Sequence, residues 1–185
     1  MPECNHEEAD TTIVVHVLHA LRNGAKTLVI RTVDTDVVVV LLGKHHQFLL
    51  ECLEMQIWIG FGMGKNCSFY HINRIYAWLG NGKCQGLSVF HALTGCDTTN
   101  SFWGKGKKSA WQAWDAFQEI TTVFCDIAAN PFRIINRDSE NFKQIERFIV
   151  VMYDKTSPSA SINDISEEVS FVTRIMGWRN CLQHR

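Results

Sequence analysis

Carboxylate side chains gather in three short stretches of the sequence. They are Glu7–Asp10 (EEAD), Asp34–Asp36 (DTD) and Gly95–Thr99 (GCDTT). Carboxylate oxygens are the ligands that hard cations such as Mg²⁺ and Mn²⁺ prefer. Two such ions held about 3.5–4 Å apart can stabilise both the attacking and the leaving oxygen of a phosphodiester. If the three stretches converge in the fold, they predict metal-dependent hydrolysis of phosphodiester bonds.

The middle stretch, DTD, follows a run of residues typical of a buried strand. TLVIRTV, from Thr27 to Val33, is short and rich in β-branched residues, and it lies between Gly24 and the acids. Two acids that are two positions apart point to the same face if the backbone stays extended. Because the carboxyl ends of strands in open α/β sheets border the ligand crevice, we expect Asp34 and Asp36 to converge there.

Each acidic stretch by itself also fits a purely structural role. Glu7, Glu8 and Asp10 would favour the N-terminus of a helix through the helix dipole. DTD is also compatible with a turn that ends the strand, and Asp97 with a cap for the following turn. Only the order of the three stretches along the chain favours a shared site.

The elements expected around the first acids alternate between helix and strand. Apolar residues recur three and four apart from His6 to Leu21, which predicts a helix. The strand at Thr27–Val33 follows, and a helix followed by such a strand is half of an α/β unit. The next run, VVVVLL, is compatible with a strand or with a short buried helix. QIWIGF and CSFYHI, separated by GMGKN, predict a β-hairpin.

Most of the remaining chain is expected to be helical. Helices are predicted from Ile72 to Leu79, through Leu93, and from near Gly106. The side chains that the last of these should bury are Ala110, Trp111, Trp114 and Phe117. Two amphipathic helices, Ser139 to Tyr153 and Asn163 to Met176, are joined by the polar segment TSPSAS.

The composition indicates a globular chain without an overall positive charge. The 185 residues are 46% hydrophobic and 20% charged, and the formal net charge is -1, so any contact to phosphate must be local. Seven cysteines without a C-x-x-C pair argue against a disulfide framework and a structural zinc site. With no signal-peptide pattern and no apolar run near the roughly 20 residues of a membrane span, we expect a nuclear or cytoplasmic protein.

A local basic segment is present in FWGKGKKSA, from Phe102 to Ala110. Its glycines leave backbone N–H groups accessible at a helix start and its lysines add charge, although a solvated basic helix start has the same composition. The residues expected to contact nucleic-acid phosphates are Gly104, Lys105, Gly106, Lys107 and Lys108. Trp103 could stack on a base or sugar, but a tryptophan beside a helix more often belongs to the core.

The order of these motifs resembles the XPG-like 5′-nuclease family, which includes flap endonucleases and bacteriophage 5′-exonucleases. That family has an acidic E-A-E or E-A-D motif opening a helix, a D-x-D after the next strand, and a G-[SC]-D before a helical Gly-Lys-rich loop. Here the motifs read Glu8-Ala9-Asp10, Asp34-Thr35-Asp36 and Gly95-Cys96-Asp97. The resemblance covers Glu7 to about Trp114, a little over half of the chain.

The resemblance implies a set of five carboxylates with catalytic and metal-binding roles. They would be Glu8, Asp10, Asp34, Asp36 and Asp97. The first two would hold one Mg²⁺ or Mn²⁺ ion and the last three a second, with Glu7 as the substitute if the register shifts by one. The segment at 95–114 resembles the family's helix-two-turn-helix element, which grips duplex phosphates. The implied substrate is DNA with a branch or a 5′ end.

The resemblance also implies a fold, a three-layer α/β domain of the PIN-like kind with a partly parallel central sheet. The nuclease portion would occupy residues 1–120, and a helical extension at 121–185 would pack on it. Family members begin with a strand that bears an aspartate, which would have to precede Met1. We therefore expect an incomplete, mobile-element-derived copy without that strand, whose exposed sheet edge pairs with a second chain or another copy.

Two functions follow from this interpretation. One is a metal-dependent nuclease, and the other is a noncatalytic module that binds nucleic acid or protein and retains the nuclease fold. Three further patterns carry less weight. GFGMGK is one residue short of a phosphate-binding P-loop and predicts a hairpin turn, and no motif makes a Cys-His hydrolase of His91 and Cys96. The histidines without a supporting ligand pattern, predicted to lie at the surface, are His16, His19, His45 and His46.

Overall fold

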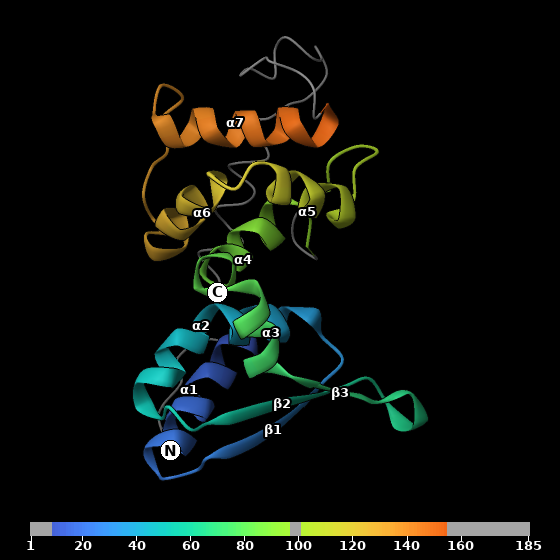
Figure 1. Ribbon diagram of the computed structural model, residues 1–185, viewed down its shortest axis with the longest axis vertical. Helices are drawn as coiled ribbons and strands as arrows, with labels where there is room; N and C mark the ends of the chain where they lie inside the picture. Colours follow the sequence, from blue (N-terminus) through green and yellow to red (C-terminus); the bar gives the residue numbers. More distant parts are fainter. Residues whose placement is uncertain (1–8, 97–100, 155–185) are drawn as a thin grey trace. The chain divides into compact units, whose positions relative to one another are not determined.

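The computed structural model describes residues 9–96 and 101–154 of the chain. These residues form seven α-helices and a three-stranded sheet, which confirms the α/β class (Figure 1). They divide into two compact units inside helix α4 (Asn81–Leu93), between Leu87 and Ser88. No helix within the described ranges is both long enough and apolar enough to cross a bilayer.

The first unit is built on a sheet with the strand order β1-β2-β3. β1 (Thr27–Thr32) pairs in parallel with β2 (Gln56–Phe61), and β2 pairs antiparallel with β3 (Ser68–His71). Helix α2 (Thr35–Glu51) connects the two parallel strands, because a parallel pair cannot be joined by a tight turn. The predicted first strand and the predicted hairpin are both confirmed.

Three helices lie along one side of this sheet (Figure 1). α1 (Ala9–Arg22) packs on α2, and α3 (Ile72–Leu79) packs on α2 and β2. The side chain of Asn73 fastens α3 to the start of β2. Its Oδ1 accepts from the backbone N–H of Ile57 at 2.9 Å, and its Nδ2 donates to the carbonyl oxygen of Met55 at 2.8 Å. α1 and α3 confirm the helices predicted at His6 to Leu21 and at Ile72 to Leu79.

β1 is an edge strand and is not buried, contrary to the sequence-based prediction. Its side chains alternate between exposed and half-buried, and Val29 is 59% exposed. Among the described residues β1 has a neighbouring strand on one side only. The β-branched composition of TLVIRTV favours a strand but does not specify how many of its faces are covered.

The VVVVLL run, which was compatible with a strand or a helix, belongs to α2. This helix of 17 residues begins after Asp34, whose side chain accepts a hydrogen bond from the backbone N–H of Asp36. The N-terminal cap and the length of the element outweigh the strand preference of four valines. The side chains of α2 that are buried are Asp36, Val37, Val39, Leu41, Leu42, His45 and Phe48.

The GFGMGK segment runs from the end of β2 into the turn of the hairpin, as predicted, and its last two residues begin the short 3-10 turn η1 (Gly64–Asn66). Gly62 has φ of 105°, and a Cβ there would lie 2.6 Å from the carbonyl oxygen of Asn66, so only glycine fits. Across the hairpin, the rings of Trp58 and His71 stack with their centroids 4.3 Å apart. This cross-strand contact helps to fix the register of β2 and β3.

The second unit is helical and includes α5 (Lys107–Ala116), α6 (Ile120–Ala129) and α7 (Glu140–Tyr153). α7 packs against both α5 and α6. Of the side chains predicted to be buried in this region, Ala110 and Trp114 are buried. Trp111 and Phe117 are half-buried. The helices predicted through Leu93 and near Gly106 are confirmed.

An aromatic chain runs through the core of the second unit, with Trp114 at its centre. The ring of Trp114 stacks on Phe90 of α4 at 4.8 Å between centroids and meets Phe124 of α6 edge-on at 5.2 Å. Phe124 in turn contacts Phe148 of α7 at 5.5 Å. The indole N–H of Trp114 donates to Thr121 Oγ1 at 2.8 Å, so the burial of its polar atom is compensated.

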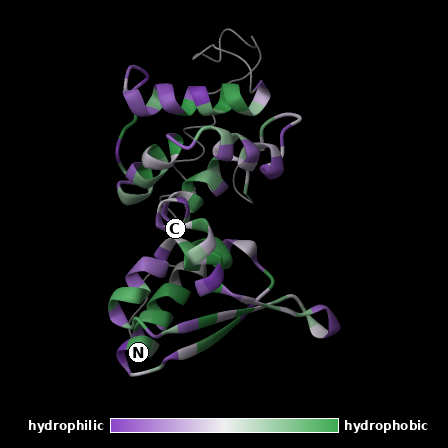
Figure 2. Ribbon diagram, viewed as in Figure 1, coloured by the Kyte–Doolittle hydropathy of each residue, from purple (hydrophilic) through white to green (hydrophobic). Residues whose placement is uncertain are grey.

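α7 confirms the amphipathic helix predicted at Ser139 to Tyr153. Along its length it alternates between hydrophilic and hydrophobic residues (Figure 2). Ser139 caps it, because its Oγ accepts from the backbone N–H of Phe142 at 3.3 Å. The helix predicted at Asn163 to Met176 lies outside the described residues.

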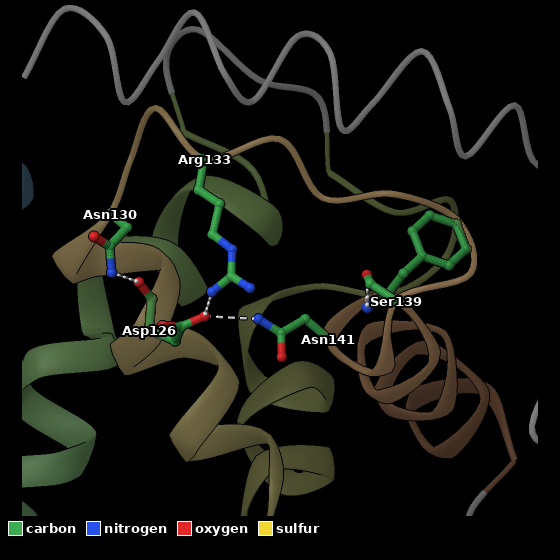
Figure 3. Close-up of polar contacts among 6 residues, drawn as sticks. Asp126, Asn130, Arg133, Ser139 and Asn141 are labelled. Atoms are coloured by element: carbon green, nitrogen blue, oxygen red, sulfur yellow. Dashed lines mark hydrogen bonds and ion pairs between the residues drawn. The ribbon is translucent and has the colours of Figure 1, made fainter.

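Asp126 holds the connection between α6 and α7 (Figure 3). Its Oδ2 accepts from Arg133 Nη1 at 2.9 Å and from Asn141 Nδ2 at 2.8 Å. Its backbone carbonyl oxygen accepts from Asn130 Nδ2 at 3.2 Å. One residue therefore links the end of α6, the loop and the first turn of α7.

His45 is buried in the first unit, so its prediction as a surface residue is wrong. It is 1% exposed, its ring stacks on Tyr76 at 4.2 Å, and neither ring nitrogen has a hydrogen-bond partner in the described part of the chain. Burial lowers the pKa of His45 to about 4; the side chain of Asn73 opposes this shift and His71 adds to it. The histidines that are exposed, as predicted, are His16, His19 and His46.

The free energy of unfolding should therefore fall as the pH drops through the range between 6.5 and about 4. In this range the unfolded chain protonates His45 while the folded protein keeps it neutral. The contribution is complete above pH 6.5 and is lost progressively below it, by at most about 3 kcal/mol. Urea unfolding between pH 7.5 and 4.5 measures this, with His46→Phe as the control for His45→Phe. Of the wild type, His45→Phe and His46→Phe, only His45→Phe should flatten the dependence of the free energy of unfolding on pH. Equal slopes in these three proteins would show that His45 is not the group responsible.

Candidate functional site

Two of the five predicted carboxylates lie together at the carboxyl end of β1. The backbone N–H of Asp36 donates to Asp34 Oδ1 at 2.8 Å, and the backbone N–H of Asp34 donates to Thr32 Oγ1 at 2.9 Å. The side chain of Asp34 is exposed, whereas Asp36 is 9% exposed in the first turn of α2. The positive end of the helix dipole stabilises negative charge at this position.

The two acids come together by a different route from the one predicted. The sequence suggested an extended strand with both side chains on one face, but β1 ends at Thr32. Asp34 is still extended, with φ of -98° and ψ of 128°, and Asp36 is already helical. Because aspartate is a strong N-cap residue, the helix starts directly after Asp34. The carboxylates therefore flank a strand-to-helix turn, and the expectation that they lie at the carboxyl end of the strand holds.

The other predicted carboxylates are not placed beside this turn by the described residues. Asp10 is the second residue of α1, while Glu7, Glu8 and Asp97 lie outside the described ranges. Within residues 9–96 and 101–154, no group of three or more His, Cys, Asp or Glu side chains is arranged to hold a metal ion. A Mg²⁺ ion usually keeps several waters and needs only one or two protein carboxylates. The hard oxygen donors of Asp34 and Asp36 suit that chemistry.

The Gly-Lys segment forms a tight turn followed by a helix start. The backbone N–H of Lys105 donates to the carbonyl oxygen of Phe102 at 3.1 Å, and these two residues form an isolated antiparallel bridge. Gly104 lies between them with φ of 66°, in the left-handed region that glycine adopts readily. Gly106 is the N-cap of α5. We name residues 102–105 the tryptophan turn.

The three lysines of this segment have different surroundings. Lys107 Nζ donates to the carbonyl oxygens of His91, at 3.2 Å, and Gly95, so its charge compensates the C-terminal end of α4. Lys105 Nζ lies 5.4 Å from the ring centroid of Tyr153, within range of a cation–π contact. Lys108 is exposed in the first turn of α5. Lys107 thus has a structural role, and Lys105 and Lys108 are better suited to contact an anion.

Trp103 is the residue that the sequence interpretation assigned least well. A tryptophan beside a helix was expected to lie in the core, yet Trp103 is 87% exposed. Its neighbour Phe102 takes the core position and is 2% exposed. The signal available in the sequence was the pair of aromatic residues directly before Gly104 and Lys105, since a turn of this size can bury only one of them.

Comparisons of the chain with known protein families, with curated proteins and with solved structures found no match. The function is therefore argued from two features of the molecule. One is the pair of carboxylates at the β1–α2 turn, and the other is the tryptophan turn with its basic helix start. They lie in different compact units.

The cap interaction predicts that two substitutions of Asp34 differ in their effect on stability. Asp34→Asn keeps a side-chain oxygen for the backbone N–H of Asp36 and should change the free energy of unfolding by less than about 0.5 kcal/mol. Asp34→Ala removes that acceptor and should lower it by about 1 kcal/mol. Urea unfolding at pH 7 measures both values. Equal destabilisation by the two substitutions would show that the cap does not contribute.

Proposed function

We propose that this chain is a metal-dependent nuclease-like domain that acts on phosphodiester bonds of DNA carrying a branch or a 5′ end. The observation that carries the proposal is the β1–α2 turn, which places Asp34 and Asp36 side by side at the carboxyl end of a parallel strand. Ligands of open α/β sheets bind at this edge. Asp34 has an exposed carboxylate at this edge and Asp36 follows in the first turn of α2, so the two residues are the proposed ligands of a hard divalent cation.

The order of elements supports a PIN-like arrangement for this part of the chain, although the described residues place helices along one side of the sheet only, which gives two of the three layers expected. α1, β1, α2 and β2 alternate, and the two strands are parallel. The nuclease resemblance implies three further carboxylates, which are Glu8 directly before α1, Asp10 in α1 and Asp97 between α4 and α5 along the chain. The edge position of β1 is where a strand from a second chain or another copy would pair.

Asp34 and Asp36 would hold the proposed divalent cation through carboxylate oxygens. Asp34 uses Oδ1 to cap α2, which leaves its other carboxylate oxygen for a cation. Asp36 adds a second carboxylate from the same turn. When bound, Mg²⁺ or Mn²⁺ would activate water and stabilise the leaving oxygen of the phosphodiester. The protein's own contribution is to fix the two carboxylates on a rigid strand-to-helix turn.

A second function, a noncatalytic nucleic-acid-binding module, is favoured by a separate observation. The tryptophan turn and the start of α5 present Trp103 and Lys108 to solvent without using any of the proposed metal ligands. Binding of nucleic acid by this part of the chain therefore does not require cleavage. The two functions share their ligand and differ in whether the phosphodiester is broken.

Purified full chain should cleave a 5′-flap DNA in the presence of Mn²⁺, and Asp34→Asn should reduce this cleavage to background while leaving the circular dichroism spectrum unchanged. The substitution removes a charge from the metal site but keeps the cap of α2, so lost activity cannot be attributed to unfolding. Gel analysis of end-labelled DNA measures the products.

Four outcomes of this experiment are possible. Cleavage that depends on Asp34 supports the nuclease. Bound but intact DNA contradicts the nuclease and supports the binding module. Folded protein that neither binds nor cleaves DNA contradicts both, and cleavage that is unchanged in Asp34→Asn indicates a contaminating enzyme.

A further inference from the structure

Trp103 is far more exposed than the aromatic side chains on either side of it in the second unit. Its 87% exposure contrasts with 2% for the adjacent Phe102 and 0% for Trp114. Burying a large apolar side chain stabilises a fold, so leaving this indole in water forgoes that contribution. A ligand that covers the indole would recover it.

The backbone that carries Trp103 is held in place by contacts on both sides. Phe102 anchors one end of the tryptophan turn in the core, and the backbone N–H of Lys105 closes the turn. The hydroxyl of Tyr153 on α7 donates to the carbonyl oxygen of Trp103 itself at 3.0 Å. The indole is therefore displayed on a backbone that is ordered before any ligand arrives, which lowers the entropic cost of binding.

The charged residues that follow Trp103 most closely along the chain are lysines. Lys105 lies two residues after Trp103, with its ammonium group near the ring of Tyr153, and Lys108 is exposed in the first turn of α5. Lys107 between them is directed to carbonyl oxygens at the end of α4. The surface thus combines one flat aromatic face with cations a few residues away. A nucleotide has the complementary features, a flat base and an adjacent phosphate.

We infer that Trp103 stacks on an unpaired nucleobase of bound DNA, while Lys105 and Lys108 contact the neighbouring phosphates. The base must be unpaired, because paired bases inside a duplex have both faces covered by their neighbours. The preferred ligand is therefore a duplex with a single-stranded flap or overhang. This inference rests on the proposed function, since it names the feature of the DNA that the same protein recognises.

The test compares the affinity of the full chain for an overhang-bearing DNA and for a blunt duplex of the same length, measured by fluorescence anisotropy. Trp103→Ala should weaken binding of the overhang DNA about tenfold, since base stacking on an aromatic side chain contributes about 1–3 kcal/mol. It should change binding of the blunt duplex less than about twofold. Trp103→Phe should retain most of the affinity. The matched control is Trp78→Ala, which removes a tryptophan that is 78% exposed on α3 of the other unit and should change neither affinity.

The lysines separate failure of this inference from failure of the proposed function. Replacing Lys105 and Lys108 with methionine should weaken binding to both DNAs. It should also reduce the salt dependence of the affinity by the amount expected for about two lost phosphate contacts. If those lysines matter but Trp103→Ala binds the overhang DNA like the wild type, the stacking role is overturned and the proposed function stands. If the folded chain binds neither DNA, both are overturned. If Trp103→Ala loses binding to anionic lipid vesicles but not to DNA, the indole serves a membrane surface and the inference is wrong.

Discussion

The second unit depends on the packing of Trp114, because this one side chain joins three helices. Its ring contacts Phe90 of α4 and Phe124 of α6, and its own backbone belongs to α5. Phe124 extends the contact to Phe148 of α7. Aromatic pairs of this kind add about 0.5–1.5 kcal/mol each beyond the area they bury. The hydrogen bond from the indole to Thr121 makes one orientation of the ring favourable.

That packing determines how the tryptophan turn is presented. The turn lies directly before α5, so the direction in which α5 leaves the core sets the position of Trp103. Tyr153, near the end of α7, contacts the same turn through its hydroxyl and through Lys105. The aromatic core around Trp114 and the exposed tryptophan turn thus both depend on α5 and α7. A substitution that loosens Trp114 would change the presentation of Trp103 without touching it.

In the first unit a single short turn has a structural role and a proposed chemical role. Asp34 is the N-cap that starts α2, and α2 is the connection that allows β1 and β2 to pair in parallel. The same residue is a proposed metal ligand. These roles are compatible because a carboxylate has two oxygens, and the backbone N–H of Asp36 occupies only Oδ1. The cap of α2 therefore needs only one side-chain oxygen at position 34. The proposed chemistry needs a charged carboxylate there, with a second oxygen for the cation.

The sequence predicted those elements whose pattern is unambiguous. Apolar periodicity predicted α1 and α7 correctly, and the turn residues predicted the hairpin correctly. It could not decide the VVVVLL run, because four valines favour a strand locally while the cap at Asp34 favours a helix. The helical extension predicted at 121–185 did not include bounds for α6, since ITTVFCDIAA is rich in β-branched residues although Ile120, Val123, Phe124 and Ile127 are buried at helical spacing.

The properties that depend on tertiary packing were the least predictable. β1 had the composition of a buried strand and is an edge strand. His45 lies in the core on the same face of α2 as Leu41 and Phe48, which became visible only once the VVVVLL run was known to be helical. Trp103 and Phe102 could not be told apart by residue type, and the structure buries only Phe102. At the candidate site, the sequence indicated that Asp34 and Asp36 would lie together, but the helix cap that brings them together follows from the three-dimensional structure.

The central claim is that the β1–α2 turn belongs to a divalent-cation site, and direct measurement of Mn²⁺ binding tests it without relying on catalysis. Electron paramagnetic resonance detects free Mn²⁺, whose signal falls when the ion binds protein. Titration of the full chain should remove free Mn²⁺ in a saturable way, and Asp36→Asn should weaken that binding while the circular dichroism spectrum stays unchanged. An undiminished Mn²⁺ signal with folded wild-type protein, or equal binding by Asp36→Asn, would contradict the claim.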